Sequence, residues 1–181
     1  DAGDGSMQDM IIADVTYHDL DSLYLKNIPK TILVTTTEGE KRKRASFIDN
    51  SGNITEIRQY LRDGTFAGFN MDYDAYGNLK KITRPANHKQ QRMWYQFGYD
   101  SVVHNYVTKV EDAFGYARSS SYDFLFGEQL STLSLNAEPM RYTLDSRGRT
   151  KTITGPYEIE ANKPYTISFE YFDSASVPYA I

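Results

Sequence analysis

The sequence predicts an all-β fold: an array of consecutive antiparallel β-hairpins with little or no helix. Three observations predict it. A short motif, Asp-x-x-Gly, recurs along the chain. The segments around each copy are rich in tyrosine and β-branched residues and alternate in polarity, which is typical of strands. No stretch sustains the 3.6-residue apolar period of a helix. We therefore expect hairpins that follow one another in a curved, extended or spiralling sheet.

The motif itself indicates how each hairpin closes. Asp is favoured at the first position of a type I turn because its carboxylate accepts hydrogen bonds from backbone N–H groups just ahead. Gly three residues later supplies the positive φ that such a loop needs. We therefore expect eight structural turn residues, in the pairs Asp49 and Gly52, Asp74 and Gly77, Asp112 and Gly115, and Asp145 and Gly148.

The spacing of the aspartates predicts repeated units. The main series consists of Asp49, Asp74, Asp100, Asp123, Asp145 and Asp173, at intervals of 25, 26, 23, 22 and 28 residues. A period in the twenties indicates a repeated supersecondary unit, here with room for two strands and their turns. Asp100 and Asp173 lack the Gly, and the Gly after Asp123 comes one place late, at Gly127. We expect one unit around each of these aspartates within residues 10–181, and a tail or linker at 1–9.

Individual strands are expected wherever β-branched, aromatic or alternating segments lie between turn signals. In the first half these segments are 10–15, 31–37, 44–47, 54–61, 66–73 and 79–83. In the second half they are 93–99, 106–110, 116–122, 130–135, 140–144, 150–154 and 165–171. Turns are expected at 38–40 and 63–64, a loop at 85–90, and a break at Gly155-Pro156.

The motif together with its flanks resembles a known repeat. Residues 73–85 and 142–156 follow the pattern Tyr-Asp-x-x-Gly-Asn/Arg-Leu-x-x-Ile-Thr, wholly or in part, and this resembles the YD repeats of the bacterial RHS-repeat family. Residues 49–181, about three quarters of the chain, resemble the YD-repeat part of large secreted proteins related to the B component of insecticidal toxin complexes. In that family the hairpins form a long strip that spirals into a hollow shell around a variable C-terminal toxin or effector region.

The resemblance implies a non-catalytic structural scaffold, a stretch of shell from a longer secreted or cell-surface bacterial protein. Its implied partners are the neighbouring repeats of the same parent chain, together with an encapsulated effector or a surface glycan or protein. The alternative is a carbohydrate- or protein-binding module that uses exposed aromatic residues. Trp94, Tyr95, Phe97 and Tyr99 are the candidates for glycan stacking. Neighbouring strand residues face opposite ways, however, which favours packing over one shared platform.

Composition argues against several other classes of function. The formal charge is −4, cysteine is absent, and no apolar run approaches the roughly 20 residues of a membrane span. We expect no nucleic-acid partner and no membrane span. The motif aspartates could be paired catalytic carboxylates, but one per repeat gives a row of turns instead of a pair. His18, His88 and His104 have no metal-type spacing. We expect no catalytic, cofactor-binding or metal-binding residue.

Three local features have two interpretations each. The run Lys41-Arg42-Lys43-Arg44 is either a basic recognition patch or, as we favour beside Glu38 and Glu40, a solvated strand edge. Asn53-Ile54-Thr55 is a formal glycosylation sequon, although Asn after the motif Gly is expected in any case. The segment 1–5 hints at a calcium loop but lacks the alternating ligands of one, so a linker is favoured.

Overall fold

The protein is described by a computed structural model that covers residues 11–37, 39 and 41–181. The chain divides into two compact parts, one up to Trp94 and one from Tyr95 onward. The expected tail at 1–9, the start of the first expected strand at Met10, and Glu38 and Glu40 lie outside the described residues.

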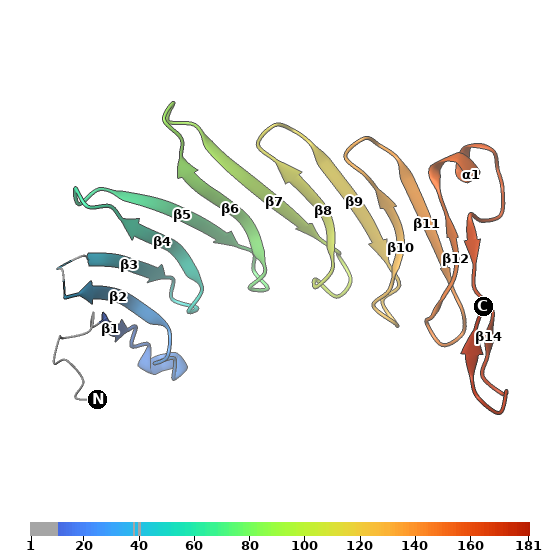
Figure 1. Cartoon of the computed structure of the whole chain (residues 1–181), viewed down its shortest axis with the longest axis horizontal. Coiled ribbons are helices and arrows are strands. Elements are labelled where there is room, and N and C mark those ends of the chain that lie inside the picture. Colours follow the sequence, from blue (N-terminus) through green and yellow to red (C-terminus); the bar gives the residue numbers. More distant parts are fainter. Residues whose placement is uncertain (1–10, 38, 40) are drawn as a thin grey trace, which may run out of the picture. The chain divides into compact units, whose positions relative to one another are not determined.

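The first part is an antiparallel sheet whose strands follow the order of the sequence (Figure 1). Its strands are β1 (Ile11–Tyr17), β2 (Pro29–Thr36), β3 (Lys41–Ile48), β4 (Ile54–Tyr60), β5 (Phe66–Tyr73) and β6 (Leu79–Ala86). Consecutive strands from β1 to β6 pair antiparallel. β3 is an internal strand, because its residues 41–45 pair with β2 and its residues 44–48 pair with β4. Within the basic run at 41–44, only Arg44 has strand partners on both sides, so residues 41–43 keep one unpaired side, as the expected strand edge would.

The second part repeats this arrangement. Its strands are β7 (Arg92–Tyr99, which begins in the first part), β8 (Val107–Asp112), β9 (Ala117–Tyr122), β10 (Gln129–Leu133), β11 (Pro139–Leu144), β12 (Thr150–Thr154) and β13 (Ile167–Ser168). Successive strands pair antiparallel. The strand expected at 165–171 is split, because β14 (Tyr171–Phe172) leaves this sheet and pairs with β15 (Tyr179–Ala180). The predicted all-β array of consecutive antiparallel hairpins is confirmed.

Helix is confined to two short segments of the described chain. A 3-10 turn, η1 (Asp21–Leu23), lies between β1 and β2, and α1 (Pro156–Glu160) follows β12. The predicted break at Gly155-Pro156 is thus the start of one helical turn, with Gly155 at the N-cap and Pro156 at the first helical position, where proline is well tolerated. Neither segment has the length or the apolar character that a bilayer-crossing helix requires.

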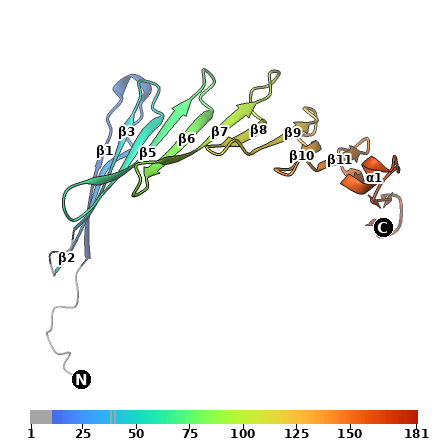
Figure 2. The same cartoon turned by 90° about the horizontal axis from the view of Figure 1, so that it is seen from above.

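The strands of each part form a single layer (Figure 2), and the described residues contain no fully buried hydrophobic side chain. The register nevertheless separates the two faces of the first part. Ile32, Ile57 and Phe69 belong to an aliphatic-rich face, whereas Leu33 and Lys43 belong to a face with more charge. Cross-strand contacts and turns, with no second layer, therefore hold each sheet together.

Candidate functional site

The motif aspartates lie in the tight turns between strands. In the turn after β3, Oδ1 of Asp49 accepts hydrogen bonds from the backbone N–H groups of Ser51 (2.8 Å) and Asn53 (2.9 Å). Oδ2 accepts a third from the side-chain amide of Asn53, at 3.0 Å. The hydrogen bond from the Asn53 side-chain amide, together with the backbone N–H donors, lowers the pKa of Asp49. This effect outweighs partial desolvation, which alone would raise the pKa. The sequon asparagine is thus part of the turn.

The other complete motifs share this geometry. Asp74 accepts from the N–H groups of Tyr76 and Asn78, Asp112 from those of Phe114 and Tyr116, and Asp145 from those of Arg147 and Arg149. The backbone closes each loop in the same way, with the N–H of the motif Gly bonded to the carbonyl of the Asp. The four glycines have φ between 81° and 85°, values that side chains with a Cβ rarely adopt.

The copies do not all lie on the same edge of a sheet. In the second part, the turns of Asp100, Asp123 and Asp145 are separated by two strands each, so they open on one edge (Figure 1). Asp112 lies one strand after Asp100, and its turn therefore opens on the opposite edge. The spacing of 22 to 26 residues is the spacing of turns along one edge.

Asp100, expected as a degenerate copy, has the most extensively bonded carboxylate of the described aspartates. It accepts five backbone N–H bonds of 2.6 to 3.2 Å, from Val102, Val103, His104, Asn105 and Tyr106. It is only 6 % exposed. Removal from water alone would raise its pKa, but the five donors outweigh this and hold the pKa of Asp100 well below its usual range.

The positive-φ position of that loop is filled by His104, with φ of 56°. Two further turns use the same substitution, one in the expected loop at 85–90 and one between the expected strands 130–135 and 140–144. Sequence reasoning placed both connections but did not identify the residues that form the turns. Asn87 and Ser134 take the place of Asp as side-chain acceptors, and Gln90 and Ala137 take the place of Gly, with φ of 61° and 60°. The available signal was an Asn or Ser at the expected turn spacing, because both residues accept the same local hydrogen bonds as Asp.

Asp173 differs from the other members of the series. It follows β14, and its carboxylate accepts two hydrogen bonds from the guanidinium of Arg149, at 2.7 and 3.0 Å. The Nε–H of Arg149 also donates to Oδ2 of Asp145, at 2.7 Å. Nη1 of Arg147 lies 3.0 Å from Oδ2 of Asp173. The pKa of Asp173 is lowered, first by the hydrogen bonds from Arg149. This aspartate pairs with the preceding motif turn.

Hydrophobic side chains from one turn cover the glycine of the next. A Cβ at Gly148 would overlap the ring of Phe126, and one at Gly127 would lie 2.9 Å from the hydroxyl of Tyr106. In the first part, Leu25 occupies the equivalent space at Gly52. At these three turns glycine therefore serves two purposes, positive φ and room for a neighbouring turn.

The motif carboxylates are used within their own turns. Within the described ranges, no group of three or more His, Asp or Glu side chains could hold a metal ion. Oδ1 of each complete motif Asp accepts backbone N–H bonds from its own turn, as at Asp49 and Asp74. The ring of His18 bonds Ser46, and His88 and His104 lie in different turns.

The candidate glycan-stacking residues are half-buried. None of Trp94, Tyr95, Phe97 and Tyr99 is among the exposed aromatic side chains. The ammonium of Lys81 lies 4.6 Å from the centre of the Trp94 ring, which occupies one face of the indole with a cation–π contact. A sugar would have to displace Lys81 to stack there.

The sequence matches no protein-family model and no curated protein. The fold is similar to chains in crystal structures of TcdB2-TccC3-Cdc42 and of TcdB2-TccC3. Both comparisons give a TM-score of 0.59 at 10 % identity and cover 80 % of this chain. The chain spans only 10 % and 11 % of the lengths of those two chains. Similarity at this identity is one of fold, and at that level the expected resemblance to toxin-complex proteins is confirmed.

Proposed function

We propose that the chain is a non-catalytic stretch of wall in an RHS-like, YD-repeat shell. The observation that carries the proposal is the repeated hairpin. Strands follow one another in sequence order, and aspartate-capped turns close the five hairpins β3–β4, β5–β6, β7–β8, β9–β10 and β11–β12. A single layer of this kind can be extended by further units without redesign, since each unit contacts mainly its neighbours. The fold similarity to TcdB2-TccC3 chains supports the same role.

The same proposal assigns a place and partners. Residues 10–181 would be a segment of a longer secreted or cell-surface protein, preceded by a linker at 1–9. The neighbouring repeats of the parent chain would cover its terminal strands, and the completed shell would enclose an effector region. The half-buried positions of Trp94 and its neighbours give no support to a glycan-binding role.

Electron microscopy of the full-length gene product tests the scaffold role. The proposal expects a hollow particle whose wall is one strand layer thick, with this segment within the wall. Limited proteolysis of the intact product should leave an enclosed region protected until the wall is opened by denaturant. A solid globular particle, or an open ribbon with no enclosed volume, would contradict the proposal.

A glycan array tests the alternative role directly. The scaffold proposal expects no saccharide binding by the 181-residue chain above that of an unrelated acidic protein. Suppose that the chain binds a defined glycan, and that Trp94→Ala abolishes the binding without changing the thermal midpoint. That result would contradict the scaffold role and support a carbohydrate-binding module.

A further inference from the structure

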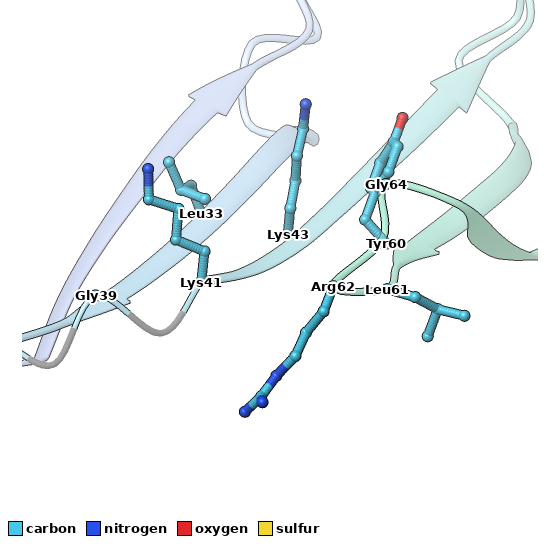
Figure 3. Close-up of a pocket in the computed structure, with 8 residues that line it drawn as sticks. All are labelled: Leu33, Gly39, Lys41, Lys43, Tyr60, Leu61, Arg62 and Gly64. Atoms are coloured by element: carbon cyan, nitrogen blue, oxygen red, sulfur yellow. The ribbon is translucent and has the colours of Figure 1, made fainter.

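The charged face of the first part contains an open hollow over strands β2, β3 and β4. Its volume is about 710 Å³, within the range of small-ligand sites. Its lining includes Leu33, Lys41, Lys43, Tyr60 and Arg62, and none of the described residues that line it is acidic. Figure 3 shows Lys41, Lys43 and Tyr60 extending in the same direction, whereas Leu61 and Arg62 point away from them.

We propose that this hollow binds an extended acidic peptide segment, with two carboxylates of the peptide on Lys41 and Lys43. The two lysines alternate with Arg42 and Arg44 along one strand, so they share a face. Both side chains are exposed. Among the described residues neither lysine forms an ion pair, and Lys43 instead lies 4.8 Å from the centre of the Tyr60 ring.

The described acidic side chains on the same face do not pair with either lysine. Leu33 on β2 is paired with Asp14 on β1 on one side and with Lys43 on β3 on the other, so the Leu33 side chain lies between Asp14 and Lys43. Glu56 holds Arg58 through both carboxylate oxygens, at 2.8 Å each. Within the described part of the chain, the two ammonium groups therefore have no carboxylate partner, and both can pair with acidic groups of a ligand.

The spacing of the lysines selects the class of ligand. Residues two apart on an antiparallel strand are separated by about 7 Å, and alternate carboxylates of an extended peptide have the same separation. In the conformation that Figure 3 shows, the two side chains extend in the same direction, so a ligand with two separate acidic groups matches them better than a single phosphate does. A long nucleic acid would also meet the rest of an acidic chain of net charge −4. Leu33 and the Tyr60 ring supply apolar contact between the charges.

Binding can be measured by fluorescence anisotropy with labelled pentapeptides. One probe alternates Glu with Ser so that its carboxylates are two residues apart, and a second has the same composition with adjacent Glu residues. We expect the alternating peptide to bind more tightly, because adjacent carboxylates of an extended chain face opposite sides. Raising the salt concentration from about 0.05 to about 0.5 M should weaken binding severalfold.

The strand supplies its own matched control. Lys41→Ala/Lys43→Ala should weaken binding about tenfold, since two solvent-exposed ion pairs are lost. Arg42→Ala/Arg44→Ala removes the same charge from the opposite face and should change it by less than about twofold. Lys41→Arg/Lys43→Arg should retain binding. Because Glu38 and Glu40 precede these lysines in the sequence, Glu38→Gln/Glu40→Gln is also measured and should bind at least as well as the parent.

Three results would overturn the proposal: equal affinity for the two peptides, equal weakening by the lysine and arginine pairs, or tighter binding of inorganic phosphate or an acidic oligosaccharide than of the alternating peptide. Circular dichroism of each variant shows whether the sheet is retained, so loss of fold is distinguished from loss of binding. The peptide-binding proposal and the scaffold proposal are tested independently, because failure to bind peptide does not change the result expected from microscopy.

Discussion

Arg149 holds both carboxylate oxygens of Asp173 although the two residues are 24 positions apart, about one repeat. The same guanidinium bonds Asp145 and lies 3.9 Å from the centre of the Tyr171 ring. Arginine is suited to this position because its planar fork donates to two carboxylates and stacks on an aromatic face at once. One side chain therefore joins a motif turn to the segment that contains β14.

Replacing this arginine tests that link. Arg149→Lys keeps the charge but loses the paired hydrogen bonds and the stacking, so we expect a lower thermal midpoint and faster hydrogen exchange at Glu170 and Ile181, whose backbone groups bond each other beside β14. Arg147→Lys is the control, because Arg147 makes a single contact with Asp173. Equal effects of the two substitutions would show that the fork geometry is unimportant.

Glycine at the turns offers a second comparison. Gly115 and Gly148 both have positive φ, so alanine at either should cost about 1 kcal/mol of unfolding free energy through backbone strain. At Gly148 the new methyl group would also overlap Phe126, whereas Gly115 has open space. We expect Gly148→Ala to lower the unfolding free energy by a further amount of about 1–3 kcal/mol, the usual penalty of overpacking.

Urea unfolding measures both variants. The double variant Gly148→Ala/Phe126→Ala should recover much of the additional loss, because the overlapping ring is removed. If Gly115→Ala lowers the unfolding free energy as much as Gly148→Ala does, the contact between Gly148 and the neighbouring turn does not contribute to stability.

A tyrosine hydroxyl links successive units in the first part. The hydroxyl of Tyr73 donates to the carbonyl of Ile54 at 3.0 Å, and the pKa of Tyr73 is raised, first by burial. Tyr73→Phe should lower the unfolding free energy by about 0.5–1.5 kcal/mol, the usual net value of one hydrogen bond. Tyr24→Phe, at a side chain 90 % exposed, should have no measurable effect. An unchanged urea midpoint for Tyr73→Phe would contradict the link.

The sequence was sufficient to predict the hairpin array because its turn chemistry is local. Asp49 and Gly52 carry both requirements of the loop, an acceptor and a positive φ, within four residues. The connections at Asn87 and Ser134 were expected, but their likeness to the motif turns was not recognised, because Gln90 and Ala137 occupy the left-handed position without a glycine. Once the flanking strands fix the loop length, the strain of a non-Gly residue there is tolerated.

Non-local features could not be read from the sequence. The internal position of β3 depends on the pairing of its residues 44–48 with β4, and four successive cations such as those at 41–44 are more typical of an edge strand. The ion pairs of Asp173 depend on the departure of β14 from the main sheet. In both cases a partner distant in sequence decides the environment.

Asp100 makes the stability of the second part dependent on pH. Its pKa in the folded chain is well below its usual range, because five backbone N–H groups outweigh desolvation. A carboxyl with a lowered folded pKa contributes stability above its unfolded pKa, about 4, and loses that contribution as the pH falls toward the folded value. We therefore expect the urea midpoint of the chain to fall steadily below about pH 4.

Asp100→Asn separates this carboxylate from the others. The amide keeps the shape but offers one acceptor oxygen and places an NH₂ group among backbone donors, so the variant should be clearly less stable than the parent at neutral pH. Because the variant cannot lose a charge at this position, its midpoint should fall less between about pH 5 and pH 3 than that of the parent. Asp72→Asn, at an exposed carboxylate on β5, is the matched control for the loss of one charge. Parallel pH profiles for the parent and Asp100→Asn would mean that other carboxylates carry the acid sensitivity.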